Sequence, residues 1–205
     1  MKHRIRTALI GQFHRPHGTA GHLAGWIMAH RGSNRRRNHW SVTLLDVQPT
    51  DHILEIGFGP GLAIAHLSRH APHGHIHGID HSAVMLRHAT RRNAAAIRAH
   101  RVTLQRATVD HLPAFQQPLD AILTVNTLGF WPHPTQRLTE LRDLLKPGGR
   151  IAITSQPRTP GADEHTSAQA ARDITQHLHD AGYTHIRTHT LDLTPPAVCV
   201  LATRP

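Results

Sequence analysis

Short apolar runs alternate with segments of helical periodicity along most of this chain. Each apolar run ends at turn-forming residues, and the segments between them place an apolar residue every three or four positions. The pattern predicts strands at residues 52–56, 75–80, 102–106, 121–126 and 150–155, helices at 61–70, 82–99, 135–145 and 168–181, and two final strands at 185–193 and 197–203. Strands that alternate with helices are typical of an α/β fold with a mostly parallel sheet.

The first predicted strand ends in a turn that has glycine at every second position, Gly57, Gly59 and Gly61. Glu55 precedes the turn, and Asp80 ends the next predicted strand. A glycine turn between a strand and a helix presents backbone N–H groups to a ligand, and a carboxylate at the next strand end can accept both hydroxyls of a ribose. The spacing differs from the dinucleotide pattern G-x-G-x-x-G. It indicates a nucleoside-containing cofactor, or a tight strand–helix connection without a ligand.

Glu55-x-Gly57-x-Gly59-x-Gly61 followed by Asp80 resembles the first two motifs of class I S-adenosylmethionine-dependent methyltransferases. Residues 119–126 and 145–153 agree with later motifs of that family, so that the resemblance covers about residues 50–156. It implies a Rossmann-like, doubly wound sheet of seven mostly parallel strands with an antiparallel last strand. We expect one domain, in which residues 1–50 form a helical cap over the cofactor site and residues 51–205 form the core.

The resemblance implies S-adenosylmethionine as cofactor and S-adenosylhomocysteine as product. It assigns cofactor binding to Glu55, Gly57, Phe58, Gly59, Gly61, Asp80, His81, Met85, Val109, Asp110 and Asn126. In that family the residue at the position of Asp110 takes the adenine amine, and the residue at the position of Asn126 contacts the methionine part. Met85 either covers one face of the adenine or is a core methionine.

The segment after the fourth core strand contains the candidate acceptor residues. Phe130 and Trp131 either form the wall of an apolar acceptor pocket or pack against the next helix, and His133 is the nearest candidate base. Trp40 is either a core anchor or a pocket wall. Residues 126–129 read Asn-Thr-Leu-Gly instead of the Asn/Asp-Pro-Pro-Tyr/Phe motif of nucleic-acid amino-methylating enzymes. This favours a small-molecule or lipid-like acceptor.

No catalytic residue is assigned, because a sulfonium donor is already electrophilic and mainly needs the acceptor held in line with it.

The formal net charge is +10 with histidine neutral, and residues 1–45 and 81–109 contain no acidic residue. This charge is either a solvated basic surface or an attraction for anionic substrates, nucleic acid or anionic lipid. The same alternatives apply to residues 35–37, three arginines that form a solvated helix face or hold an anionic group. An RNA methyltransferase is therefore the second interpretation, and a cofactor-binding protein without methyl transfer is the third.

The single cysteine, Cys199, excludes an internal disulfide and a thiolate metal cluster and indicates a buried thiol in a cytoplasmic protein. No apolar run reaches the length of a membrane-spanning helix. His73, His75 and His77 recur at every second position, which raises the question of a metal site. We expect none, because no carboxylate or cysteine lies nearby in the sequence. The oligomeric state does not follow from the sequence.

Overall fold

The computed structural model describes residues 32–205, which form one seven-stranded sheet with helices on both faces. The strands are β1 (His52–Ile56), β2 (His75–Asp80), β3 (Val102–Arg106), β4 (Leu119–Val125), β5 (Leu145–Ser155), β6 (Thr184–Leu191) and β7 (Ala197–Thr203). The helices are α3 (Gly32–Leu44), α4 (Leu62–His70), α5 (Ala83–Arg92), α6 (Ala94–Arg98), a 3₁₀ turn η1 (Leu128–Phe130), α7 (Pro134–Leu144) and α8 (Glu164–Asp180).

The strand order is β3-β2-β1-β4-β5-β7-β6. β1 to β5 pair in parallel, whereas β7 is antiparallel to both β5 and β6. This confirms the predicted doubly wound, mostly parallel sheet with an antiparallel last strand. The chain moves from β1 outward to β3 and then crosses back to β4 on the other side of β1. A crevice forms at such a switch point, outside the carboxyl ends of the strands.

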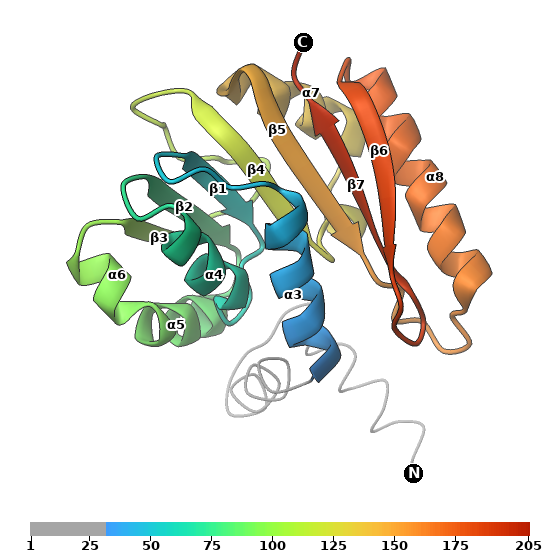
Figure 1. Cartoon of the computed structure of the whole chain (residues 1–205), viewed down its shortest axis with the longest axis horizontal. Coiled ribbons are helices and arrows are strands. Elements are labelled where there is room, and N and C mark those ends of the chain that lie inside the picture. The colour runs from blue at the N-terminus through green and yellow to red at the C-terminus, as the bar shows by residue number, and fades with distance from the viewer. Residues whose placement is uncertain (1–31) are drawn as a thin grey trace.

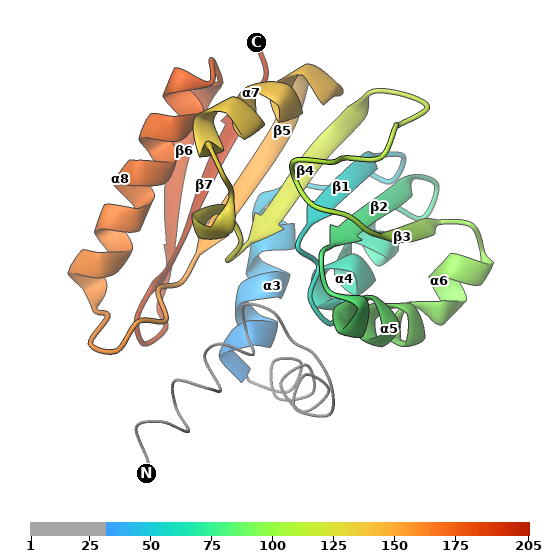
Figure 2. The ribbon, with the colours of Figure 1, turned by 180° about the vertical axis from the view of Figure 1, so that it is seen from behind.

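Two apolar layers cover the sheet. Helices α3, α4 and α5 lie over one face (Figure 1), and α7 and α8 lie over the other (Figure 2). Successive residues of β1 point to opposite faces of the sheet. Ile53 packs in the cluster that includes residues of α4 (the α4 layer) and Leu54 in the cluster that includes residues of α7 (the α7 layer), and both are fully buried. Burial of each such side chain contributes roughly 1.5–3 kcal/mol. Both faces of the strand are covered, which explains why the parallel strands read as continuous apolar runs.

The predicted bounds of β1, β2, β3 and β7 are those of the structure. The single helix predicted at residues 82–99 is wrong, because the chain breaks at Asn93 into α5 and α6. The Asn93 amide Nδ2 donates to the carbonyl oxygens of Gly61 and Ala89, at 3.2 and 2.9 Å. This buried side chain ties the break to the glycine turn.

Two further elements, β5 and α8, begin four or five residues earlier than predicted. β5 begins at Leu145 and not at residue 150, and its pairing with β4 shifts register between Leu119 and Ala121. Helix α8 begins at Glu164 and not at residue 168, because Asp163 forms a capping box. The Asp163 carboxylate accepts the backbone N–H of Thr166 at 2.9 Å, and the Thr166 hydroxyl accepts the N–H of Asp163 at 3.3 Å.

Helix α3 is the described part of the predicted N-terminal cap; residues 1–31 of that cap lie outside the described residues. α3 packs against α4 and also reaches β4, β5 and β7. The hydroxyls of Ser41 and Thr154 share a hydrogen bond of 2.7 Å between α3 and the end of β5. Across residues 32–205, no helix has the length and apolarity needed to cross a membrane.

Of the three period-two histidines, His75 and His77 lie on β2 and His73 does not. His73 lies exposed in the turn before β2, and His52 of β1 joins His75 and His77 instead. The rings of His75 and His77 are 4.5 Å apart, and those of His52 and His75 are 6.3 Å apart. In the described part of the chain, no group of three or more His, Cys, Asp or Glu residues is arranged to hold a metal ion.

Candidate functional site

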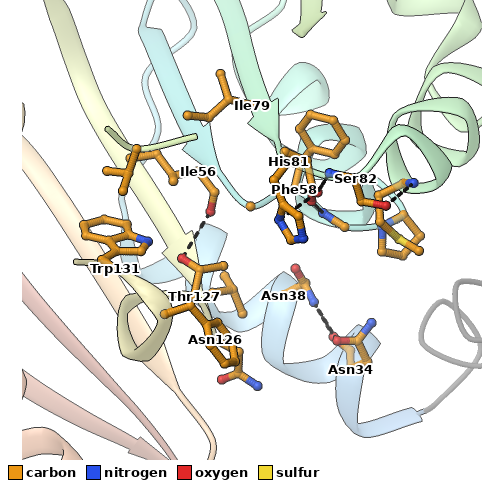
Figure 3. Close-up of a pocket in the computed structure, with 18 of the residues that line it drawn as sticks. Asn34, Asn38, Ile56, Phe58, Ile79, His81, Ser82, Asn126, Thr127 and Trp131 are labelled. Carbon is orange, nitrogen blue, oxygen red and sulfur yellow. Dashed lines mark hydrogen bonds and ion pairs between the residues drawn. The ribbon is translucent and has the colours of Figure 1, made fainter. Parts of the chain in front are cut away.

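A large cavity opens at the carboxyl ends of β1, β2, β4 and β5. Its volume is about 2040 Å³, compared with roughly 300–1,000 Å³ for most small-ligand pockets. Helix α3 lies along one side of it, with Asn34 and Asn38 opposite the strand ends (Figure 3). The cavity therefore lies at the switch point of the sheet and has room for two small molecules side by side.

Each of the three glycines of the turn is required, or tolerated, for a different structural reason. Gly57 has φ of +74°, and a Cβ there would lie 2.2 Å from Cγ2 of Thr127. At Gly61, with φ of +76°, a Cβ would lie 2.8 Å from the Cβ of Ala89. At Gly59, with φ of +52°, a Cβ would meet no atom within 4 Å, although Gly59 lines the cavity. Packing within the protein requires the first and third glycines, whereas the second leaves open space in the cavity.

Asp80 holds the turn in place from the end of β2. Its Oδ2 accepts the backbone N–H of Gly59 and its Oδ1 accepts the N–H of Ser82, both at 2.8 Å. Ser82 in turn caps α5, because its hydroxyl accepts the N–H of Met85 at 3.3 Å. Each carboxylate oxygen has capacity for a further hydrogen bond. Asp80 lines the cavity, so this capacity suits ligand hydroxyls.

Glu55 lies behind the turn and does not line the cavity. It is 1% exposed, and its Oε2 has no hydrogen-bond partner. Burial raises the pKa of Glu55 well above its usual range, and the nearby Asp80 charge raises it further. Burial also raises the pKa of Asp80, but the N–H groups of Ser82 and Gly59 and the His81 side chain oppose that shift. These contacts favour the negative charge of the pair on Asp80, on the side of the cavity, over Glu55.

The other predicted cofactor residues gather along the β2 and β3 side of the cavity. Phe58, His81, Met85, Val109 and Asp110 all line it. Figure 3 shows Phe58, His81 and Ser82 together on this side. Met85 is 3% exposed and also belongs to the core cluster that includes residues of α4, so its position is compatible with both alternative interpretations. Gly61 does not line the cavity, since its space is closed by α5.

Asn126 and Thr127 directly follow the end of β4. Asn126 has a left-handed backbone with φ of 60°, and its Oδ1 accepts the N–H of Gln156 at 2.7 Å. Its Nδ2 is buried without a hydrogen-bond partner, and the residue lines the cavity. The Thr127 side chain packs against Gly57 of the glycine turn and lies across from Ile56 in Figure 3. Sequence reasoning missed Thr127, whose signal was its position directly after a central strand.

The aromatic acceptor candidates divide between the cavity and the core. Phe130 lines the cavity and is 62% exposed. Trp131 also lines the cavity, but it is 9% exposed and packs in the α7 layer. Trp40 packs against the α4 layer and His133 is exposed at the start of α7, and neither lines the cavity. The structure therefore supports the core-anchor interpretation of Trp40 and places His133 away from the cavity wall.

Helix α3 and the segment after β5 add polar residues that the sequence did not reveal. Arg37 is 1% exposed, donates from Nη2 to Oδ1 of Asn34 at 2.6 Å, and donates from Nη1 to Oε1 of Gln156. Gln156 Nε2 donates to the carbonyl of Pro195 at 2.8 Å. Arg35, by contrast, is exposed and outside the cavity lining. The three-arginine run is therefore divided between solvent and the site.

Comparison with known proteins gives a consistent result. The family described as a methyltransferase domain matches residues 53–149. The uncharacterized methyltransferase YdaC of Bacillus subtilis (strain 168) is 32% identical over 184 residues, which cover 89% of this chain and 98% of that protein. A demethylmenaquinone methyltransferase of Lactiplantibacillus plantarum is 32% identical over 137 residues, which cover 63% of this chain and 56% of that protein.

Among solved structures, the N-methyltransferase NodS from Bradyrhizobium japonicum WM9, in complex with S-adenosylhomocysteine, has a TM-score of 0.68. The match covers 88% of this chain and 91% of NodS at 15% sequence identity. The likeness to NodS shows a shared fold.

Proposed function

Because this chain belongs to the class I S-adenosylmethionine-dependent methyltransferases, with S-adenosylmethionine as its methyl donor, we propose that its acceptor is a small organic molecule. The open space at Gly59 beside the Asp80 carboxylate carries the assignment of the donor site. A side chain at that glycine would fill the space through which a ligand approaches the turn. The residues present therefore fit the cofactor that the family uses.

The donor would lie along the β1–β3 side of the cavity. We assign the ribose hydroxyls to Asp80, the adenine to the segment of Val109 and Asp110 with Met85 on one face, and the methionine part to the region of Asn126. All five of these residues line one continuous cavity. Asp80 can accept ribose hydroxyls through its carboxylate oxygens, and the N–H groups of Gly59 and Ser82 favour its charged form.

The acceptor would lie between Phe130, Trp131 and helix α3. The cavity volume of about 2040 Å³ leaves room beside a nucleoside cofactor for a second small molecule. An exposed phenylalanine at the rim suits an acceptor with apolar surface. The similar demethylmenaquinone methyltransferase acts on a quinone-type molecule by its name, which agrees with a small or lipid-like acceptor for this chain.

When bound, S-adenosylmethionine supplies a methyl group on a sulfonium that is already electrophilic. The protein's task is to hold the acceptor's nucleophilic atom in line with that methyl and to exclude water. Phe130 and Trp131 can fix an acceptor by apolar contact, and Asn126 Nδ2 can donate a hydrogen bond to either ligand. A general base is needed only for an acceptor that must lose a proton, so we assign none.

The experiment that tests this function is calorimetric titration of S-adenosylmethionine and S-adenosylhomocysteine into the purified full chain. Micromolar binding of both is expected, and a folded sample that binds neither would refute the assignment. A panel of small acceptors is then screened by measuring the release of S-adenosylhomocysteine, with the protein-free reaction as control. Binding without turnover on any acceptor in a broad panel would favour a cofactor-binding protein.

An RNA acceptor is the second candidate, because the formal net charge is +10 and Arg35 and Arg36 are exposed on α3. RNA binding through phosphate contacts would weaken steeply with salt. Filter binding of a mixed-sequence RNA at rising salt concentration separates the two candidates. Strong, salt-sensitive binding together with methyl transfer to RNA would favour the second. Whichever acceptor is used, we place the reaction in the cytoplasm, in keeping with the buried free thiol of Cys199.

A further inference from the structure

Arg37 is a buried cation that faces the cavity without an anionic partner. It is 1% exposed and lines the cavity, and within residues 32–205 its guanidinium donates to the amide oxygens of Asn34 and Gln156. Its Nε has no partner, and no carboxylate among residues 32–205 forms an ion pair with it. Burial of a charge is costly unless a counter-charge compensates it. The folded chain therefore retains a charge that a ligand can neutralise.

Another donor and another positive charge line the same cavity. Asn126 Nδ2 is buried and unpartnered, and its Oδ1 is fixed by the N–H of Gln156. Burial lowers the pKa of Arg37 to about 9, and the charge of Arg158, which also lines the cavity, contributes to that shift. We call Arg37 and Arg158 the basic end of the cavity; Asn126, assigned above to the methionine part of the donor, follows β4, which lies between β1 and β5.

Acidic residues line only the opposite end. Within the described residues, the cavity's carboxylates are Asp80 at the end of β2 and Asp110 after β3. The lining residues contributed by α3 and by the segments after β4, β5 and β6 include no Asp or Glu. At the Asp80 end the two carboxylates accompany the lining cations Arg87 and Arg106, whereas the end at Arg37 and Arg158 has cations and no lining carboxylate.

We propose that the basic end of the cavity binds a carboxylate group of the methyl acceptor. The planar guanidinium of Arg37 has five N–H donors, of which two are engaged, and carboxylate is the anion that matches its fork geometry. The apolar walls Phe130 and Trp131 would contact the rest of the molecule. The inference rests on the proposed methyl-transfer function and narrows its acceptor to small organic acids with an apolar body.

The carboxylate could instead belong to the methionine part of the cofactor. The position of Arg37 favours the acceptor, because its contacts run to Gln156 after β5 and from there to Pro195 between β6 and β7. The glycine turn and Asp80 are on β1 and β2, on the other side of β4. The two sources of the same group are separable by experiment.

The test uses benzoate and benzamide as probes, titrated by calorimetry into the full chain saturated with S-adenosylhomocysteine. We expect benzoate to bind at least about tenfold tighter than benzamide, a difference of about 1.4 kcal/mol. Arg37→Gln should abolish this preference while leaving the affinity for S-adenosylhomocysteine within about twofold. Arg35→Gln, an exposed arginine on the same helix, is the matched control and should leave benzoate binding unchanged.

A second arm identifies the source of the carboxylate. S-adenosylhomocysteine and 5′-methylthioadenosine, which lacks the amino-acid part, are titrated into the wild type and Arg37→Gln. If the variant weakens S-adenosylhomocysteine about tenfold but not 5′-methylthioadenosine, Arg37 holds the cofactor and the proposal is overturned. Equal affinity of benzoate and benzamide for the wild type also overturns it.

Folding of the variant does not limit the test. If Arg37→Gln does not fold, Arg158→Gln, which changes an exposed residue at the rim, carries the same comparison. It should weaken benzoate several-fold and leave S-adenosylhomocysteine unaffected; no change in benzoate affinity would contradict the proposal. If the wild type does not bind S-adenosylhomocysteine, the methyltransferase function is refuted and this inference with it. Binding of the cofactor without a benzoate preference would refute the inference alone.

Discussion

Gly59 offers the sharpest test of the donor site, because its side-chain position faces the cavity and not the protein. We predict that Gly59→Ala leaves the fold intact and weakens S-adenosylhomocysteine binding by at least about tenfold, or about 1.4 kcal/mol. The residue has φ of +52°, and a Cβ there meets nothing within 4 Å in the protein. The added methyl group would occupy the space that the ligand needs to approach the turn.

The folding cost follows from the backbone alone. A left-handed conformation costs an L-residue about 1–2 kcal/mol, against a typical unfolding free energy of about 5–15 kcal/mol. For a chain of this size, each kcal/mol lowers the melting temperature by about 2–4 °C. We therefore expect Gly59→Ala to melt about 2–8 °C below the wild type and to remain folded at room temperature.

Gly148 provides the matched control. It has φ of +76° and also no atom within 4 Å of a built Cβ, and it lies outside the cavity lining. Gly148→Ala should show a similar loss of melting temperature with unchanged cofactor affinity. Gly57→Ala should destabilise more than either, because its Cβ would lie 2.2 Å from Thr127 Cγ2. Calorimetry and thermal melts measure both quantities, and wild-type affinity in a folded Gly59→Ala protein would refute the assignment of this turn to the cofactor.

Three further predictions concern single residues. Asp80→Ala should weaken S-adenosylhomocysteine at least about tenfold in calorimetry, because it removes the ribose acceptor and the carboxylate that holds the N–H of Gly59; unchanged affinity would contradict the role. Burial and the neighbouring histidines lower the pKa of His77 from 6.5 to about 4, so the unfolded chain binds the proton more tightly. Stability from this group is present above about pH 6.5 and is lost as the pH falls toward 4, by about 1–2 kcal/mol after discounting for solvent screening. Urea unfolding at pH 7 and pH 4.5 should show a smaller loss for His77→Gln than for the wild type, and equal losses would disprove it. The buried thiol of Cys199 has its pKa raised to about 12, so iodoacetamide at pH 8 should label it only after unfolding, and rapid labelling of the folded protein would be the contrary result.

The strands of the sheet were predictable because the residues that mark each strand are adjacent in the sequence. β1, β2 and β3 are apolar runs bounded by turn residues, and their neighbours in space do not alter where they begin and end. The break at Asn93 was not predictable in the same way. It depends on an amide that donates to Gly61, a residue 32 positions earlier in the chain.

The candidate site shows the same division. The glycine turn and Asp80 lie within one strand–helix–strand unit, so their spacing alone indicated a nucleoside ligand. Arg37 and Gln156 are 119 positions apart, and each residue is unremarkable in the sequence. Arg37 stood in a run of arginines that gave no indication of which one was buried. Only the packing of α3 across β4, β5 and β7 brings the basic end of the cavity together.

The separation of the two ends of the cavity has a consequence for how such an enzyme can diversify. Residues at the donor end come from the ends of β1 and β2, the segment after β3 and Asn126 directly after β4, whereas the acceptor end uses α3, Phe130, Trp131 and the segments after β5 and β6. Substitutions in the second group can change the molecule that is methylated without disturbing the binding of the common donor. Directed evolution confined to these segments would explore new substrates while the methyl-donating machinery is inherited unchanged.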